Sequence, residues 1–175
     1  MARLACRNVI ARALGWLEDR RTLGFGLLLL WAVYFAVIAF GNLSELLWSF
    51  GWIDWADRSG NLHWIAVTTE IFVESRALNQ LLLAGAILIE AAASVLLWRA
   101  LVLWVKKASA AQAAARGGLL VATTVWFTYA IITELTVSYQ RGNNESDYWV
   151  ICSSSLATFL VIALLARDAG EPEVA

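Results

Sequence analysis

Charged residues are scarce in this 175-residue chain, at 15% of the total, and the formal net charge is only -1. A protein that binds nucleic acid usually carries a basic patch with interleaved aromatic residues, and none occurs here. Hydrophobic residues make up 61% of the sequence, against roughly 45–50% in soluble domains. The shortage of charge therefore argues against a nucleic-acid partner and for a protein that has the lipid bilayer as its surroundings.

Histidine, cysteine and proline are also rare. The one histidine, His63, excludes paired-histidine haem ligation within this chain, and no metal or other cofactor is expected. The two cysteines, Cys6 and Cys152, are expected on opposite sides of the membrane and so would not form a disulfide. The single proline lies in the polar tail, so no proline-rich linker divides the chain. Phosphate-binding glycine loops, nucleophile elbows and Cys-x-x-Cys pairs are absent, which favours a non-enzymatic protein.

Long apolar runs dominate what is present, and each is near the roughly 20 residues that a helix needs to cross a bilayer. They predict an all-α polytopic membrane protein, with a four-helix transmembrane domain over residues 22–166. The predicted spans are 23–40, 81–104, 118–138 and 149–166. The flanking segments are a basic N-terminal segment, 1–21, which is either an interfacial helix or a flank that orients the first span, and a polar tail, 167–175.

The distribution of lysine and arginine predicts the orientation. Ten of these residues fall in the N-terminal segment, in residues 99–117 around the loop between the second and third spans, and in the tail, whereas three fall in the other two loops. The positive-inside rule then places both termini in the cytoplasm. It leaves one large outer loop, 41–80, with a short helix expected over Leu62 to Arg76. Four tryptophans of this loop suit an aromatic belt or a surface for a partner protein: Trp48, Trp52, Trp55 and Trp64.

The most informative polar residue is Glu90, at the centre of the second span. At about 1.5 Å of rise per residue it lies about 14 Å from the outer end, and Trp31, Tyr129 and Thr158 come out at the same depth on other helices. No Lys, Arg or His lies at that level, so burial favours the neutral acid. We expect Glu90 to be protonated and hydrogen-bonded to Tyr129 or Thr158.

A second buried layer is predicted nearer the outer side, where Glu134 on the third span meets serines of the fourth span, among them Ser154. Ionisable residues inside a membrane are costly and are commonly functional. Glu90 and Glu134 are therefore either hydrogen-bonded struts that fix the helix register or parts of a path for protons or small cations. The path would need polar groups in the inner half, where few occur.

Several short motifs resemble an uncharacterised bacterial family of small integral membrane proteins with four predicted transmembrane helices. The likeness covers about residues 80–142 and includes the following pieces: Glu90, Trp98-Arg99-Ala100, Ala108-Ser109-Ala110-Ala111-Gln112, Trp126-Phe127, Glu134 and Tyr139-Gln140. The chain departs from the family pattern beside the second acid, where it has Thr133 before and Leu135-Thr136 after, and in its tryptophan-rich outer loop. The resemblance implies a bacterial plasma membrane and no established activity.

Three functional hypotheses follow from these observations. The first is a non-enzymatic accessory or interaction subunit of a membrane assembly, with a partner subunit or a second copy of the chain docked at the outer loop. The second is a channel or transporter for protons or a small cation that uses Glu90 and Glu134. The third is a protein or enzyme subunit that binds a quinone or lipid in an apolar slot between aromatic side chains.

Overall fold

The computed structural model describes residues 20–56, 60–70, 72–136 and 145–167. Across these ranges the chain forms five helices and no strand. The helices are α2 (Arg20–Ser49), α3 (Asn61–Thr69), α4 (Arg76–Val105), α5 (Ala111–Thr136) and α6 (Glu145–Arg167). The predictions for most of the basic N-terminal segment, for the tail and for most of the short outer loop fall outside the described residues.

Four of these helices are long and apolar enough to cross a bilayer, which confirms the all-α, four-helix membrane architecture. The candidate spans are Arg21–Ser49, Arg76–Val105, Ala111–Leu135 and Tyr148–Leu165. Large apolar side chains also cover the outside of the bundle, for example Leu88 and Leu135, which are 71% and 74% exposed. Such a surface would be unfavourable in water and is suited to lipid.

The helices extend beyond the predicted spans, most of all at the end of the first span. We predicted that this span would end at Phe40 and that a loop would begin at residue 41, but α2 continues to Ser49. The helix gives way to a turn in which Gly51 has a φ of 74°, a left-handed conformation that favours glycine. Trp48 therefore lies on α2 and not in a loop. The short helix expected over Leu62 to Arg76 is present as α3, but it ends earlier, at Thr69.

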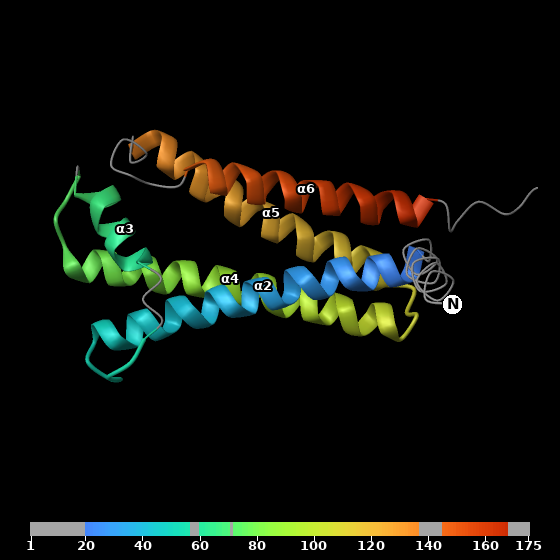
Figure 1. Cartoon of the computed structure of the whole chain (residues 1–175), viewed down its shortest axis with the longest axis horizontal. Coiled ribbons are helices and arrows are strands. Elements are labelled where there is room, and N and C mark those ends of the chain that lie inside the picture. Colours follow the sequence, from blue (N-terminus) through green and yellow to red (C-terminus); the bar gives the residue numbers. More distant parts are fainter. Residues whose placement is uncertain (1–19, 57–59, 71, 137–144, 168–175) are drawn as a thin grey trace, which may run out of the picture.

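The long helices run up and down in chain order (Figure 1). α2 packs along α4, α4 packs against α5, and α5 packs along α6. The pair α2–α4 and the pair α5–α6 diverge toward one end of the bundle, and α3 lies at that end (Figure 1). We refer to it as the α3 end. α3 contacts α4, α2 and α5, so this short helix fills the region where the two pairs separate.

The opposite end is closed by direct packing of α2 on α4. Arg21 donates hydrogen bonds to the backbone carbonyls of Trp104 and Val105, and the indole of Trp104 donates to the carbonyl of Arg21. A Cβ placed on Gly24 would collide with the Trp104 ring. Glycine at this position thus lets the indole lie directly on the α2 backbone.

Candidate functional site

Glu90 is buried because it occupies a core position of α4. The inward-facing residues of this helix recur every three or four positions, as expected for one helical face. They include Leu83, Ile87, Glu90, Ser94 and Leu97. Only 1% of Glu90 is exposed, and its neighbours along the stripe are mostly apolar. A carboxyl group at such a position needs hydrogen bonds from other helices to offset the cost of its burial.

Two side chains from different helices supply these hydrogen bonds. The Tyr129 hydroxyl of α5 donates to Oε1 of Glu90 at 3.0 Å. The Asn42 side-chain amide of α2 donates to Oε2 at 2.7 Å. Glu90 therefore links three of the four long helices through a single carboxyl group.

The network continues from Asn42 toward the α3 end. Asn61, the first residue of α3, donates its side-chain amide to Oδ1 of Asn42. The backbone N–H of Asn61 donates to Oε2 of Glu45 at 3.2 Å. Glu45 is itself 6% exposed, so it is a second buried acid. Asn61 thus holds α3 to two polar residues of α2, one of which contacts Glu90.

The predicted contact between Glu90 and Tyr129 is confirmed, but the contact predicted as an alternative, with Thr158, is not formed. Thr158 instead accepts a hydrogen bond from the Trp31 indole at 3.0 Å and donates to the carbonyl of Ser154. Depth along the helices correctly placed Trp31 and Thr158 at one level. Depth alone does not specify rotation about each helix axis, and rotation determines which pairs meet.

The prediction of a second buried acid at Glu134 is wrong for the same reason. Ala130 and Thr133 of α5 face the core of the bundle and have no exposed surface. Glu134 is turned away from that face of the helix and is exposed. Ser154 is exposed as well, with its hydroxyl bonded to the carbonyl of Val150 in its own helix. Of the three consecutive serines 153–155 on α6, Ser155 is the buried one, and it accepts a hydrogen bond from Thr123 of α5.

The four tryptophans predicted to form an outer surface differ in how far their side chains are exposed. Trp52 and Trp55 are 72% and 61% exposed, and Trp48 is partly exposed on α2. Trp64 instead turns inward and packs against Tyr148 of α6, with 5.9 Å between ring centroids. It lies one helical turn from Asn61 and Thr68 on the same face of α3, so it belongs to the interior.

Asn42, Glu45 and Asn61 were not predicted as site residues. The predicted first span ended at Phe40, so these residues were expected in a loop. The signal is present in retrospect. Asn42 continues the helical spacing of the buried residues Phe35 and Ala39. Extending that spacing by one turn would have placed a polar side chain in the core. The pairing of Asn42 with Glu90 would still have required the three-dimensional arrangement.

A cavity of about 360 Å³ lies beside this network, toward the α3 end. Glu90, Asn42 and Tyr129 line it together with Trp64 and Thr68 of α3. Much of the remaining wall is apolar and comes from α4. Two of these α4 residues, Leu81 and Ile89, are 68% and 53% exposed on the outside of the bundle. The cavity therefore reaches the surface that faces lipid.

Among the residues that line this cavity, three polar side-chain atoms lack hydrogen-bond partners within the described part of the chain. They are Nε1 of Trp64, Oγ1 of Thr68 and Nε1 of Trp126, and all three are buried. Thr68 and Trp126 are only 5% and 6% exposed. These atoms are enclosed by protein and are not accessible from the cavity, and burying a polar group without a partner is costly.

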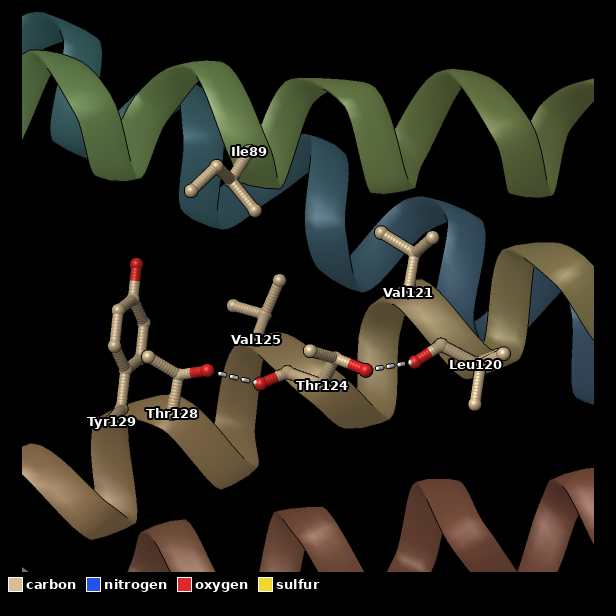
Figure 2. Close-up of a pocket in the computed structure, with 7 residues that line it drawn as sticks. All are labelled: Ile89, Leu120, Val121, Thr124, Val125, Thr128 and Tyr129. Atoms are coloured by element: carbon tan, nitrogen blue, oxygen red, sulfur yellow. Dashed lines mark hydrogen bonds between the residues drawn. The ribbon is translucent and has the colours of Figure 1, made fainter.

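A smaller groove of about 290 Å³ adjoins the cavity on the outside of α4 and α5. The two share Ile89, Thr128 and Tyr129. In Figure 2, Ile89 extends from α4 toward Val125 and Tyr129 of α5. The hydroxyls of Thr124 and Thr128 bond to the carbonyls of Leu120 and Thr124 along their own helix (Figure 2). The groove therefore presents an essentially apolar surface.

Over the residues that the structure describes, no three His, Cys, Asp or Glu side chains come together as a metal site. Comparison of the chain with protein-family models, with curated proteins and with solved structures gave no match.

Proposed function

We propose that this protein is a non-enzymatic membrane protein that binds a lipid-soluble molecule in the cavity beside Glu90. The observation that supports this function is the cavity itself, whose polar wall lies at Glu90 and whose apolar wall reaches the lipid-facing surface. Small-molecule sites commonly have this composition, with a few polar groups in a mostly apolar wall and a volume of roughly 300–1,000 Å³. Of the three hypotheses from the sequence, this one extends the third.

Gly85 allows a direct test because it lines the cavity and a Cβ there would meet no atom within 4 Å. Gly85→Leu should therefore fill part of the cavity without displacing a neighbouring helix. Gly26 of α2 is the matched control, since a Cβ there is equally unobstructed and it does not line the cavity.

The protein would be purified from membranes in mild detergent, and co-purifying lipid-soluble molecules would be quantified by mass spectrometry. Wild type and Gly26→Leu should retain the same molecule, and Gly85→Leu should lose most of it. Equal retention by both variants, or no bound molecule in the wild type, would refute the proposal.

A path for protons or small cations is the second candidate. It is supported by the hydrogen-bonded series from Glu90 through Asn42 to Asn61, which ends at the second buried acid, Glu45. Proteoliposome flux measurements would test it. Glu90→Gln should abolish the flux because an amide forms hydrogen bonds but does not ionise. Flux that is unchanged in Glu90→Gln would eliminate this function.

An interaction role is compatible with ligand binding and remains a proposal. Its support is the group of exposed aromatic side chains between α2 and α4, which comprises Phe50, Trp52, Trp55 and Phe72. A partner subunit or a second copy of the chain would cover them. Purification under native conditions that yields only a lone monomer would count against this role.

We also propose that the protein lies in a bacterial plasma membrane with both termini in the cytoplasm, so that the α3 end faces outward. The excess of lysine and arginine at the opposite end supports this orientation, and the sequence resemblance supports the membrane. Reporter fusions at each terminus would test the orientation. Activity of an exported reporter at either terminus would reverse it.

A further inference from the structure

The short helix α3 forms part of the cavity wall at the α3 end of the bundle. Asn61, Ile65 and Thr68 line the cavity from α3, and Leu83 and Glu90 line it from α4. α3 lies where the pairs α2–α4 and α5–α6 diverge (Figure 1). Movement of this one helix away from the bundle would therefore open the cavity, and with it Glu90, toward that end of the protein.

Few apolar contacts hold α3 in this position. Of its nine residues, Ile65 and Thr68 are the buried ones. Ile65 packs in a small apolar cluster with Leu83 of α4, and Leu62 and Trp64 pack against this cluster but are only partly buried. An isolated helix of this length is unstable in water, so α3 depends on these contacts. Segments with few buried apolar contacts open locally at a lower free energy than the rest of a protein.

Side-chain hydrogen bonds attach both ends of α3 to the bundle. At its first residue, the Asn61 amide donates to Oδ1 of Asn42 on α2. At its last residue, the Thr69 hydroxyl donates to Oδ1 of Asn79 on α4 at 2.7 Å. A hydrogen bond contributes little net stability when water can replace the lost partner. These attachments can therefore be released at low cost when α3 moves outward.

The present position of α3 also carries a cost. Oγ1 of Thr68 and Nε1 of Trp64 are buried and have no partner among the described residues. Both side chains lie on the face of α3 that is turned inward, so both would reach water when the helix moves away from the bundle. A buried polar group without a partner loses the hydrogen bonds that water would give it. Opening would remove this penalty.

We propose that α3 is a lid over the cavity beside Glu90, held closed by polar bonds at its two ends and opened when Asn61 separates from Asn42. The structure shows the closed position. In the open position, the cavity and Glu90 are exposed to the aqueous phase at the α3 end. This inference rests on the proposed function, because it describes how the binding site of that function is reached.

A cysteine at position 83 would report the position of the lid, because Leu83 packs in one cluster with Ile65 of α3 and has no exposed surface. The full chain with Leu83→Cys and Cys6→Ser would be treated in mild detergent with a charged, water-soluble maleimide. Cys152 of α6 is buried and serves as the internal control, since it should react only if the whole bundle unfolds.

Two substitutions in α3 should change the labelling rate at position 83 in opposite directions, because this rate follows the population of the open state. Asn61→Ala removes one attachment and should raise the rate about fivefold. Thr68→Val removes the unpartnered hydroxyl with little change of shape and should lower the rate about fivefold. His63→Ala is the matched control, because His63 is exposed on the same helix, and it should leave the rate unchanged.

Equal labelling in Asn61→Ala and Thr68→Val, or reaction of Cys152 in parallel with position 83, would overturn the lid. Hydrogen exchange of the α3 amides, measured without the added cysteine, should rank the variants in the same order and stands even if Leu83→Cys fails to fold. Loss of the lid would leave the cavity as a lipophile site. The predicted labelling order in a protein that retains no lipid-soluble molecule would instead keep the lid and overturn the ligand site.

Discussion

Asn42 of α2 donates a hydrogen bond to Glu90 of α4 at 2.7 Å and accepts one from Asn61 of α3. One amide group thus connects the buried acid to the short helix that covers the cavity. An asparagine in a membrane core is costly unless both its donor and its acceptor are used. Asn42 uses both, and it thereby joins α3 and Glu90 in one polar network that borders the cavity.

Replacing Asn42 by alanine should destabilise the protein by about 1–3 kcal/mol, because the carboxyl group of Glu90 and the amide of Asn61 would each lose a buried partner. Thr124→Val is the control, since that hydroxyl bonds only within its own helix and is exposed. The measurement is reversible unfolding in mixed micelles. Equal stability of the two variants would show that the Asn42 network contributes little to folding.

Tyr129 and Glu90 should be energetically coupled because their side chains are directly hydrogen-bonded at 3.0 Å. A double-mutant cycle with Tyr129→Phe and Glu90→Gln should give a coupling energy of about 0.5–2 kcal/mol. The same cycle with Glu134→Gln in place of Glu90→Gln is the control and should be additive, since Glu134 is exposed. Additivity in the Glu90 cycle would contradict the contact.

Thr158→Val should weaken the attachment of α6 to α2, because it removes the acceptor of the Trp31 indole. We expect a loss of about 1 kcal/mol. Ser154→Ala is a useful comparison on the same helix, because its hydroxyl contacts only the carbonyl of Val150. A larger effect at Ser154 than at Thr158 would support the layer predicted from sequence over the contact seen in the structure.

Gly24 and Gly26 should respond in opposite directions to substitution by alanine. A Cβ at Gly24 would collide with the Trp104 ring, whereas none of the described atoms lies within 4 Å of a Cβ at Gly26. We expect Gly24→Ala to destabilise by about 1–3 kcal/mol through overpacking. Gly26→Ala should be neutral or stabilising by up to about 1 kcal/mol, because alanine favours the helix. Thermal unfolding in detergent would compare them.

Much of the architecture was predictable because it depends on composition along the chain. Long apolar runs with few charges specify membrane-spanning helices, and the order of the runs specifies four of them. The central position of Glu90 in its span predicted a buried acid with a neutral partner, and Tyr129 is one of the two partners proposed. The end of α2 was less predictable, because Gly41 and Asn42 are residue types that commonly end a helix, yet α2 continues to Ser49.

The sequence alone determined that this chain folds as four apolar helices with one acid at the centre of the second span. Only the tertiary structure decided which polar groups meet. Rotation about each helix axis turned Glu134 and Ser154 outward and brought Asn42 to Glu90, and the inward fold of α3 placed Trp64 and Thr68 beside the acid. Depth follows from position in the sequence, but rotation depends on the packing of all the helices together.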